Sequence, residues 1–475
     1  MKAASLEGVS TGRAGRARSA SMTTTVTPVL SAGKTVLTRR HVLSRLAGTG
    51  AVLAAACGRA GTGPGGPAPQ ATAGIPPAEI FFITPAGAGL EQELYTSFLN
   101  DFMKRYPQIT VRYSWEEWGP YPAKLKTLLA SGQVPDMVHQ HFTVVRDFAS
   151  LGALADLKPF MRRDGVQESE FVTVLMEIFQ YKGRQAALPK DSAGWGIYYN
   201  KDLFDKAGVK YPDPNWTWEQ FLETCKALTK PEDKIFAISN WRIRPDSEQH
   251  LGILRSFGGG FYSNDLTRSI IDTDASVEAL QFTADLELKH KVTPQSHGFQ
   301  WQGDAFRNQV VAMAIGFHST AFFIKAERRE FKYDVVPYPR GRGGQFVPVG
   351  ASGWAVPEQA KYREHGWLLV KFLTSKEVQS TIARGKRWGA SRPDSLDELM
   401  PDDGVPANAR LVHIDPLKGK GPVQALAYAV PVGHIDILQV WDTEFAPVYQ
   451  GQRTPKEAAQ AAKPQIDQIL ARASQ

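Results

Sequence analysis

Apolar and polar positions follow two different periods along the first part of the folded sequence. The apolar run at 79–83 predicts a strand, whereas apolar residues within 90–106 recur at the helical spacing of three and four, and Pro107 ends that pattern. The next elements of this set are a strand at 109–115, a helix at 121–130 and a strand that opens at 135–138. Strands that alternate with helices predict a doubly wound α/β layer, in which ligands bind beyond the carboxyl ends of the strands.

A second set of the same kind follows Leu188 and Pro189. Thr217 is placed to cap a helix over 218–228, because its hydroxyl can accept a backbone N–H of the first turn. The other elements are strands at 197–200, 235–238 and 333–339 and an amphipathic helix at 275–289. Two such sets in a chain of this length indicate two domains rather than one.

The N-terminal residues carry an export pattern rather than part of the fold. Arg39 and Arg40 precede a short apolar stretch at 46–56, which is too short to cross a bilayer as a helix. The stretch ends in small residues directly before Cys57. This order predicts a twin-arginine export signal with a lipoprotein processing site, and two acyl chains on Cys57 would anchor the protein stably. The alternative is ordinary signal cleavage, and residues 1–21 are expected to be an overlong gene prediction.

The positive charge of the whole chain belongs to this signal. The sequence has 55 basic and 48 acidic residues, a formal net charge of +7, but residues 1–56 contain eight of the basic and one of the acidic residues. The rest of the chain therefore has 47 of each and is neutral. It lacks the electrostatic footprint of a nucleic-acid-binding protein.

Between the signal and the fold lies a stretch that cannot build a core. Residues 57–77 consist, after the cysteine, mainly of Gly, Pro and Ala, so we expect a flexible tether. If Cys57 is acylated, Cys225 has no disulfide partner, and the core alone must stabilise the fold. No later apolar stretch is long enough to predict a transmembrane helix.

Several segments occur in the order typical of one family of receptors. They are 129–136 (LASGQVPD), 187–191 (ALPKD), 197–204 (IYYNKDLF), 207–219, 306–316 (with VAMAIG) and 367–377 (ending in Ser-Lys-Glu). From about residue 79 onward, the ordered set resembles the family 1 extracellular solute-binding proteins, the maltodextrin-binding-like periplasmic and lipoprotein receptors.

The resemblance implies a two-lobe periplasmic-binding-protein fold of the type II kind, α/β in class, with the ligand cleft between lobes that close by hinge bending. The implied boundaries are 78–189 plus about 338–378 for lobe 1, 190–337 plus about 379–475 for lobe 2, and crossings near 188–194, 336–345 and 375–390. It also implies the receptor role in an ABC importer, with permease subunits and a cytoplasmic ATPase as partners. We expect a monomer on the outer face of the cell membrane, without catalysis, cofactor or metal.

A sugar is held by aromatic side chains on its ring faces and planar polar groups on its hydroxyls. The candidates for such contacts are Asp191, Trp195, Trp241, Trp301, Phe317, His318, Trp354, His139, Gln140, His141 and His434. In the family an acidic ligand-binding residue is common near the first crossing. This chain has Ala193 at its commonest position, so Asp191 is the nearest substitute, and its alternative role is to cap the loop.

Phe317 and His318 stand where relatives often have a variable residue and an aromatic stacking residue. With His318 in the stacking position, Phe317 would supply the aromatic face. This departure also suggests a different sugar or a non-sugar ligand.

The tryptophans have competing roles. Trp241 follows the strand at 235–238, and we expect it to be exposed to the cleft rather than buried. The other three tryptophans each have an alternative to ligand contact. Trp195 would pack at the hinge, Trp301 at a helix start, and Trp354 inside a lobe. Trp118 either lines the cleft rim or belongs to a solvated turn, and the turn is favoured.

His139 and His141 should face the same side of a strand, because alternate residues do. A metal site would need a third ligand, which is not identifiable, so hydrogen bonding to a ligand or loop is favoured for this His-Gln-His segment. His434 is a candidate because it falls near a segment that contributes ligand contacts in relatives.

No enzyme motif accompanies these candidates. The sequence has no nucleophile elbow, no paired zinc-binding histidines of the H-E-x-x-H type and no phosphate-binding loop, and Glu116 and Glu117 are adjacent, so they cannot flank a glycosidic bond. Aromatic richness and neutral charge favour an uncharged polyol or oligosaccharide. The alternatives are a glycerol phosphodiester or a polyamine, a glycan hydrolase with carboxylates from distant segments, and a tethered scaffold.

Overall fold

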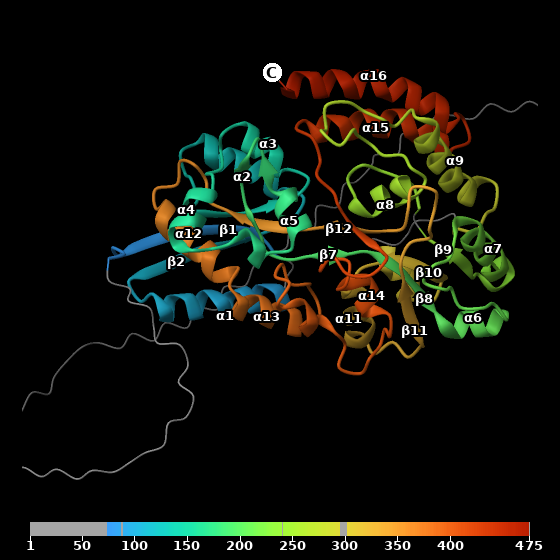
Figure 1. Cartoon of the computed structure of the whole chain (residues 1–475), viewed down its shortest axis with the longest axis horizontal. Helices are drawn as coiled ribbons and strands as arrows, with labels where there is room; N and C mark the ends of the chain where they lie inside the picture. The colour runs from blue at the N-terminus through green and yellow to red at the C-terminus, as the bar shows by residue number, and fades with distance from the viewer. Residues whose placement is uncertain (1–73, 87–88, 240, 295–301, 475) are drawn as a thin grey trace, which may run out of the picture. The chain divides into compact units, whose positions relative to one another are not determined.

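The computed structural model describes residues 74–86, 89–239, 241–294 and 302–474. In these ranges the strands form sheets of five, four and three strands and one short hairpin (Figure 1). The five-stranded sheet has the order β2 (Ile109–Glu116), β1 (Ala78–Pro85), β3 (Met137–His141), β13 (Ser352–Ala355) and β6 (Leu188–Pro189). β1 pairs in parallel with β2 and β3, and β13 pairs antiparallel with β3 and β6. The predicted alternation of strands and helices in this region is confirmed.

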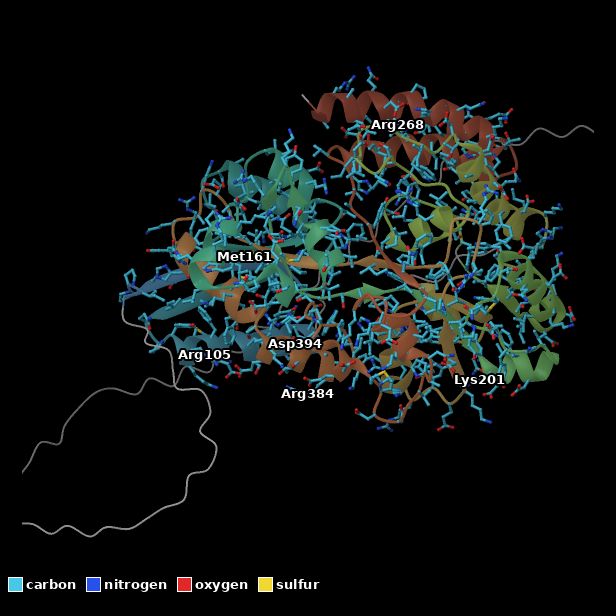
Figure 2. The ribbon with its side chains drawn as sticks, in the orientation of Figure 1. Arg105, Met161, Lys201, Arg268, Arg384 and Asp394 are labelled. Carbon is cyan, nitrogen blue, oxygen red and sulfur yellow. The ribbon has the colours of Figure 1, made fainter. Side chains whose placement is uncertain are left out.

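Helices cover the five-stranded sheet. They are α1 (Leu90–Arg105), α2 (Tyr121–Ala130), α3 (Val145–Ser150), α4 (Lys158–Asp164), α5 (Thr173–Ile178), α12 (Arg363–Leu373) and α13 (Lys376–Arg384). α1 buries Phe98, Leu99 and Phe102, which share one helical face, and places basic residues in its last turn, where they complement the helix dipole. Met161 of α4 is buried, whereas Arg384 lies at the surface (Figure 2).

Asp136 explains why the Pro-Asp pair precedes β3. Its carboxylate accepts the backbone N–H of Phe81 in β1 at 2.9 Å and that of Tyr362, just before α12, at 2.8 Å. One buried side chain therefore joins two strands to a helix from the far end of the sequence. Gly366 of α12 packs directly on this point, since a Cβ there would lie 2.0 Å from the Asp136 carbonyl oxygen.

The four-stranded sheet has the order β11 (Tyr333–Val336), β8 (Gly196–Asn200), β10 (Val311–Gly316) and β9 (Phe236–Ile238). Its accompanying helices are α6 (Lys201–Ala207), α7 (Trp218–Leu228), α8 (Glu248–Ser256), α9 (Asp274–Leu288), α10 (Gln302–Arg307), α11 (Ser319–Ala326), α14 (Ala409–His413), α15 (His434–Tyr449) and α16 (Pro455–Ser474). Thr217 caps α7 as predicted, in a reciprocal pair of hydrogen bonds with Gln220.

The chain passes between these two sheets through a third, of order β14 (Gln424–Ala427), β12 (Phe346–Gly350) and β7 (Ala193–Gly194). The backbone N–H of Lys190 donates to Ser352 O at 2.8 Å and that of Ser192 to Gly389 O at 3.0 Å. Three passages therefore lie side by side, the first around Lys190 and Ser192, the second ending at Ser352 and the third around Gly389. The second passage runs through 346–352, which is later in the sequence than the expected crossing near 336–345. Residues 341–344 instead form a turn bonded to the end of α8, with Gly343 N–H donating to Ser256 O at 2.8 Å.

The remaining regular elements are short. They are β4 (Gln180–Tyr181), β5 (Arg184–Gln185) and the 3₁₀ turns Glu168–Glu170, Pro231–Asp233 and Leu396–Leu399. None of the helices in the described ranges combines the length and apolar composition that a bilayer-crossing segment needs.

Candidate ligand-binding cleft

A cavity of about 650 Å³ lies where the three passages meet. It combines aromatic faces with charged groups, as expected of a small-molecule site, and its volume is within the range of such sites. Its lining residues are Glu91, Trp118, His141, Asp191, Ser192, Ala193, Trp195, Glu248, Asp304, Arg307, Phe317, Ser319, Phe323, Gly350, Ala351, Ser352, Arg387 and Trp388. We refer to this cavity as the cleft.

Both large sheets contribute to the cleft. His141 ends β3 and Trp118 follows β2, so both stand at the carboxyl ends of parallel strands, where ligands bind in open α/β sheets. Phe317 follows β10 of the four-stranded sheet. The passages supply Asp191 to Trp195, Gly350 to Ser352, and Arg387 with Trp388.

Aromatic rings form much of the lining. Trp195 and Phe317 pack with ring centroids 4.8 Å apart. Trp118 is 47% exposed, although its ring meets His141 edge-on. The guanidinium of Arg387 lies over the Trp388 ring, 4.3 Å from its centroid. These residues give the cleft much of its aromatic lining.

A buried ion network supports the first passage. Lys190 Nζ lies 3.5 Å from Glu91 Oε1 and 3.5 Å from Asp191 Oδ2, and 3.3 Å from the Tyr95 hydroxyl oxygen. Burial alone would lower the pKa of Lys190, but the facing Tyr95, Asp191 and Glu91 outweigh it and raise that pKa. The lysine therefore stays charged at physiological pH, between two cleft carboxylates.

Asp191 combines a place in the cleft lining with a structural hydrogen bond. It lines the cleft, and its Oδ1 accepts the backbone N–H of Ser352 at 2.7 Å, which joins the first two passages. Burial raises the pKa of the Asp191 carboxyl, while Lys190 opposes the shift.

Glu248 is the most strongly perturbed acid of the cleft. Trp195 Nε1–H donates to Glu248 Oε1 at 2.8 Å, so the carboxyl group orients the indole ring. Burial raises the pKa of Glu248 to about 7, although the Trp195 hydrogen bond opposes this. Gly350 makes room for the acid, because a Cβ there would lie 2.2 Å from Oε1.

The prediction that Trp241 is exposed to the cleft is wrong. Its side chain is 2% exposed and is absent from the cleft lining; its ring packs 4.8 Å from Phe221 and 5.8 Å from Trp218. Helix α7 carries both partners and lies against β9, so the residue that leaves this strand remains covered by the helix.

Trp354 also packs inside a lobe, which was the alternative role. It is fully buried in the core of the five-stranded sheet, with its ring 5.4 Å from Phe82 and Lys190 Nζ 5.1 Å from its centroid. Its ring packs against the buried Lys190 and does not line the cleft.

His139 and His141 do face the same side of β3, since both rings meet Trp118 edge-on. Only His141 lines the cleft, and its Nδ1 lies 2.8 Å from Thr143 Oγ1. His139 and Gln140 are buried, and burial lowers the pKa of His139 well below its ordinary value. Their side-chain polar atoms have no hydrogen-bond partner among the described residues.

The two other histidines lie elsewhere. His434 is 1% exposed and is absent from the cleft lining, and burial lowers its pKa to about 3. His318 turns away from Phe317 and lines a different cavity. Trp301, Arg39, Arg40 and Cys57 lie outside the described residues.

Sequence reasoning missed several cleft residues, namely Glu91, Glu248, Asp304, Arg307, Phe323, Arg387 and Trp388, and it favoured a solvated turn for Trp118. Glu248 meets Trp195 across 53 positions, and no local pattern marks that contact. Within the described ranges, no three His, Cys, Asp or Glu side chains are grouped to hold a metal ion.

Comparisons with known proteins bear on the family and the fold. A sequence model described as bacterial extracellular solute-binding protein matches residues 86–380. The arabinooligosaccharide-binding protein of Bacillus subtilis (strain 168) is 24% identical over 305 residues, covering 61% of this chain and 68% of that protein. The maltotriose-binding protein of Pyrococcus abyssi (strain GE5 / Orsay) is 22% identical over 341 residues, covering 72% and 69%.

A solved structure shares the fold. The ABC substrate-binding protein of Listeria monocytogenes in complex with cycloalternan superimposes with a TM-score of 0.72 at 24% identity, covering 83% of this chain and 99% of that one. The predicted two-lobe periplasmic-binding-protein fold is thereby confirmed.

Proposed function

The chain belongs to the family of bacterial extracellular solute-binding proteins, and from this premise we propose that it is the receptor of an ABC importer and captures a carbohydrate in the cleft. One observation carries the choice of ligand: a cavity of about 650 Å³ gathers aromatic rings and planar polar groups around one space. A sugar presents apolar ring faces and a rim of hydroxyls, which these two kinds of group complement.

The charges of the cleft favour an uncharged ligand. Lys190 lies between Glu91 and Asp191, and Arg307 pairs with Asp304 at 2.5 Å, so three of the four acids that line the cleft have a cation close to them. Burial raises the pKa of the fourth, Glu248, to about 7, which disfavours its charged form. A polyamine would need an excess of carboxylates that this arrangement does not offer. The two relatives with arabinooligosaccharide and maltotriose in their names, and the solved neighbour with cycloalternan, are consistent with an oligosaccharide.

Capture would proceed by closure of two lobes. The sequence placed lobe 1 at 78–189 plus about 338–378 and lobe 2 at 190–337 plus about 379–475; because 341–344 bond to α8, we move the second boundary to the passage at 346–352. The side-by-side passages support this, because a few backbone torsions within them can rotate one lobe against the other. A closed receptor would then deliver its solute to permease subunits powered by a cytoplasmic ATPase.

The location follows from the N-terminal sequence. Arg39 and Arg40 would direct the chain to twin-arginine export, and Cys57 would carry the lipid anchor outside the membrane. The tether over 58–77 would leave the receptor, as a monomer, free to reach its permease.

A glycerol phosphodiester is the second candidate, and Arg387 is the observation that favours it. This half-buried cation lies against the rings of Phe323 and Trp388 in the cleft, and burial lowers its pKa. A phosphate group would pair with such a guanidinium.

Calorimetric titration of the purified protein tests both candidates. The panel would contain monosaccharides, linear and cyclic glucooligosaccharides, arabinooligosaccharides, glycerophosphocholine and spermidine. We expect one carbohydrate class to bind, and Trp118→Ala to weaken that binding at least fivefold, because an exposed ring face is lost. Tyr113→Ala is the matched control, since Tyr113 is 37% exposed and does not line the cleft.

Other outcomes would redirect the assignment. Binding of glycerophosphocholine alone would replace the carbohydrate with the phosphodiester. Turnover of a glycan on long incubation, without stoichiometric binding, would sink the receptor role in favour of a hydrolase.

A further inference from the structure

A second cavity, of about 510 Å³, lies beside β8, α11 and α14. Its lining is mostly apolar and includes Ala321, Phe322, Leu399, Val405 and Ile414. The space is within the range of small-molecule sites. The carbohydrate proposal makes no use of it.

His318 gives this cavity a specific polar feature. The ring is 6% exposed and lines the cavity, and its Nε2 has no hydrogen-bond partner among the described residues. Burial lowers the pKa of His318 well below its ordinary value, although the ring donates to the carbonyl of Arg387. The neutral ring therefore carries its proton on Nδ1, and Nε2 presents a lone pair that only a donor can satisfy.

The neighbouring polar groups are already paired. The Tyr198 hydroxyl lies 2.9 Å from His413 Nε2, and His413 Nδ1 lies 2.9 Å from Gly194 O. His413 thus donates through Nδ1 to the carbonyl and accepts the phenol proton at Nε2. Of the side chains that line this cavity in the described ranges, only His318 has a buried polar atom without a partner.

The charged residues at this cavity neutralise one another. Lys325 pairs with Asp403 at 2.6 Å. Lys386 donates to the backbone carbonyl of Met400 at 2.6 Å and lies 3.5 Å from Asp402. The cavity therefore offers an occupant mostly apolar contact, paired charges, and His318 Nε2 as a buried acceptor that has no partner among the described residues.

We propose that this cavity is a second binding site, for a small uncharged molecule with an apolar body and a hydroxyl group that donates to His318 Nε2. This proposal does not depend on which ligand binds in the cleft, although neighbouring residues line the two cavities. Phe317 and Ser319 line the cleft on either side of His318, and Arg387 lines the cleft next to Lys386.

The test compares two probes of nearly equal shape, 1-naphthalenemethanol and 1-ethylnaphthalene, titrated into the purified protein and followed by ligand-observed NMR. We expect both to bind and the alcohol to bind about fivefold more tightly, because only it can satisfy the nitrogen. His318→Phe should bring the two affinities to within twofold. Equal affinities in the unchanged protein would overturn the proposal.

A second variant guards against a fold defect in His318→Phe. Ala326 is exposed and lines the cavity, so Ala326→Trp should fill the space and reduce the binding of both probes at least tenfold. Ala123→Trp, at an exposed helical alanine that lines neither cavity, should leave both affinities unchanged. Absence of saturable binding by either probe, or binding that persists in Ala326→Trp, would also refute the site.

Discussion

Trp195 and Trp241 both adjoin strands that follow Leu188 and Pro189, yet they belong to different regions. Trp195 is half-buried in the cleft, and its N–H is held by Glu248. Trp241 is buried in an aromatic cluster with Trp218 and Phe221. Their placement beside a strand is similar, and the covering elements differ. A tryptophan near a strand end therefore lines a cleft only where no helix packs over it.

The largest expected effect concerns the buried cluster. Trp241→Ala should lower the free energy of unfolding by about 3–5 kcal/mol, because it leaves a cavity among packed rings. Urea denaturation measures this. The carbohydrate affinity of the protein that remains folded should change less than twofold. A loss of affinity without a loss of stability would show that Trp241 contributes to the cleft after all.

The next effect is a pH dependence centred on the cleft. Glu248 has a folded pKa of about 7 against an ordinary value of 4.5. Its pKa is raised on folding, so the unfolded chain releases the proton first, and stability falls as pH rises from about 4.5 to 7. The total loss should be about 3 kcal/mol, and Glu248→Gln should remove it.

Urea denaturation of both proteins at pH 5 and pH 8 checks this expectation. Glutamine keeps an acceptor for Trp195 but cannot ionise. Equal pH dependence in the two proteins would show that Glu248 titrates normally.

The smallest effect concerns the cleft ring itself. Trp195→Ala should weaken carbohydrate binding by about 1–2 kcal/mol, roughly 5- to 30-fold, because a stacking face is lost. Trp195→Phe keeps a ring but loses the N–H that meets Glu248, so its affinity should be intermediate. Calorimetric titration separates the three proteins, and wild-type affinity in Trp195→Ala would exclude the ring from the site.

Much of the fold was predictable because its signals are local. The strand and helix at 79–106, the helix at 121–130 and the capping role of Thr217 depend on neighbours within a few positions, and the structure confirms each. The cleft was less predictable. Asp191, Trp195, Phe317 and His141 line it as expected, but Glu248 and Arg387 reach it from segments without a recognisable pattern.

His318 illustrates the limit most clearly. The sequence placed Phe317 and His318 at the site together, whereas the turn before α11 directs them into different cavities. The two residues are neighbours in sequence, yet their side chains point in different directions. Only the packing of α11 and the third passage determines which cavity each side chain lines.

By itself, the sequence determined the order of strands and helices, which spacing and residue type encode locally, and it contained the ordered segments that resemble the family. The tertiary structure alone decided which tryptophans are covered, which acid lies against Trp195, and that Lys190 is buried between Glu91 and Asp191. Except for the neighbours Lys190 and Asp191, these contacts join residues tens of positions apart, and their burial and pKa shifts arise only when the packed elements exclude water.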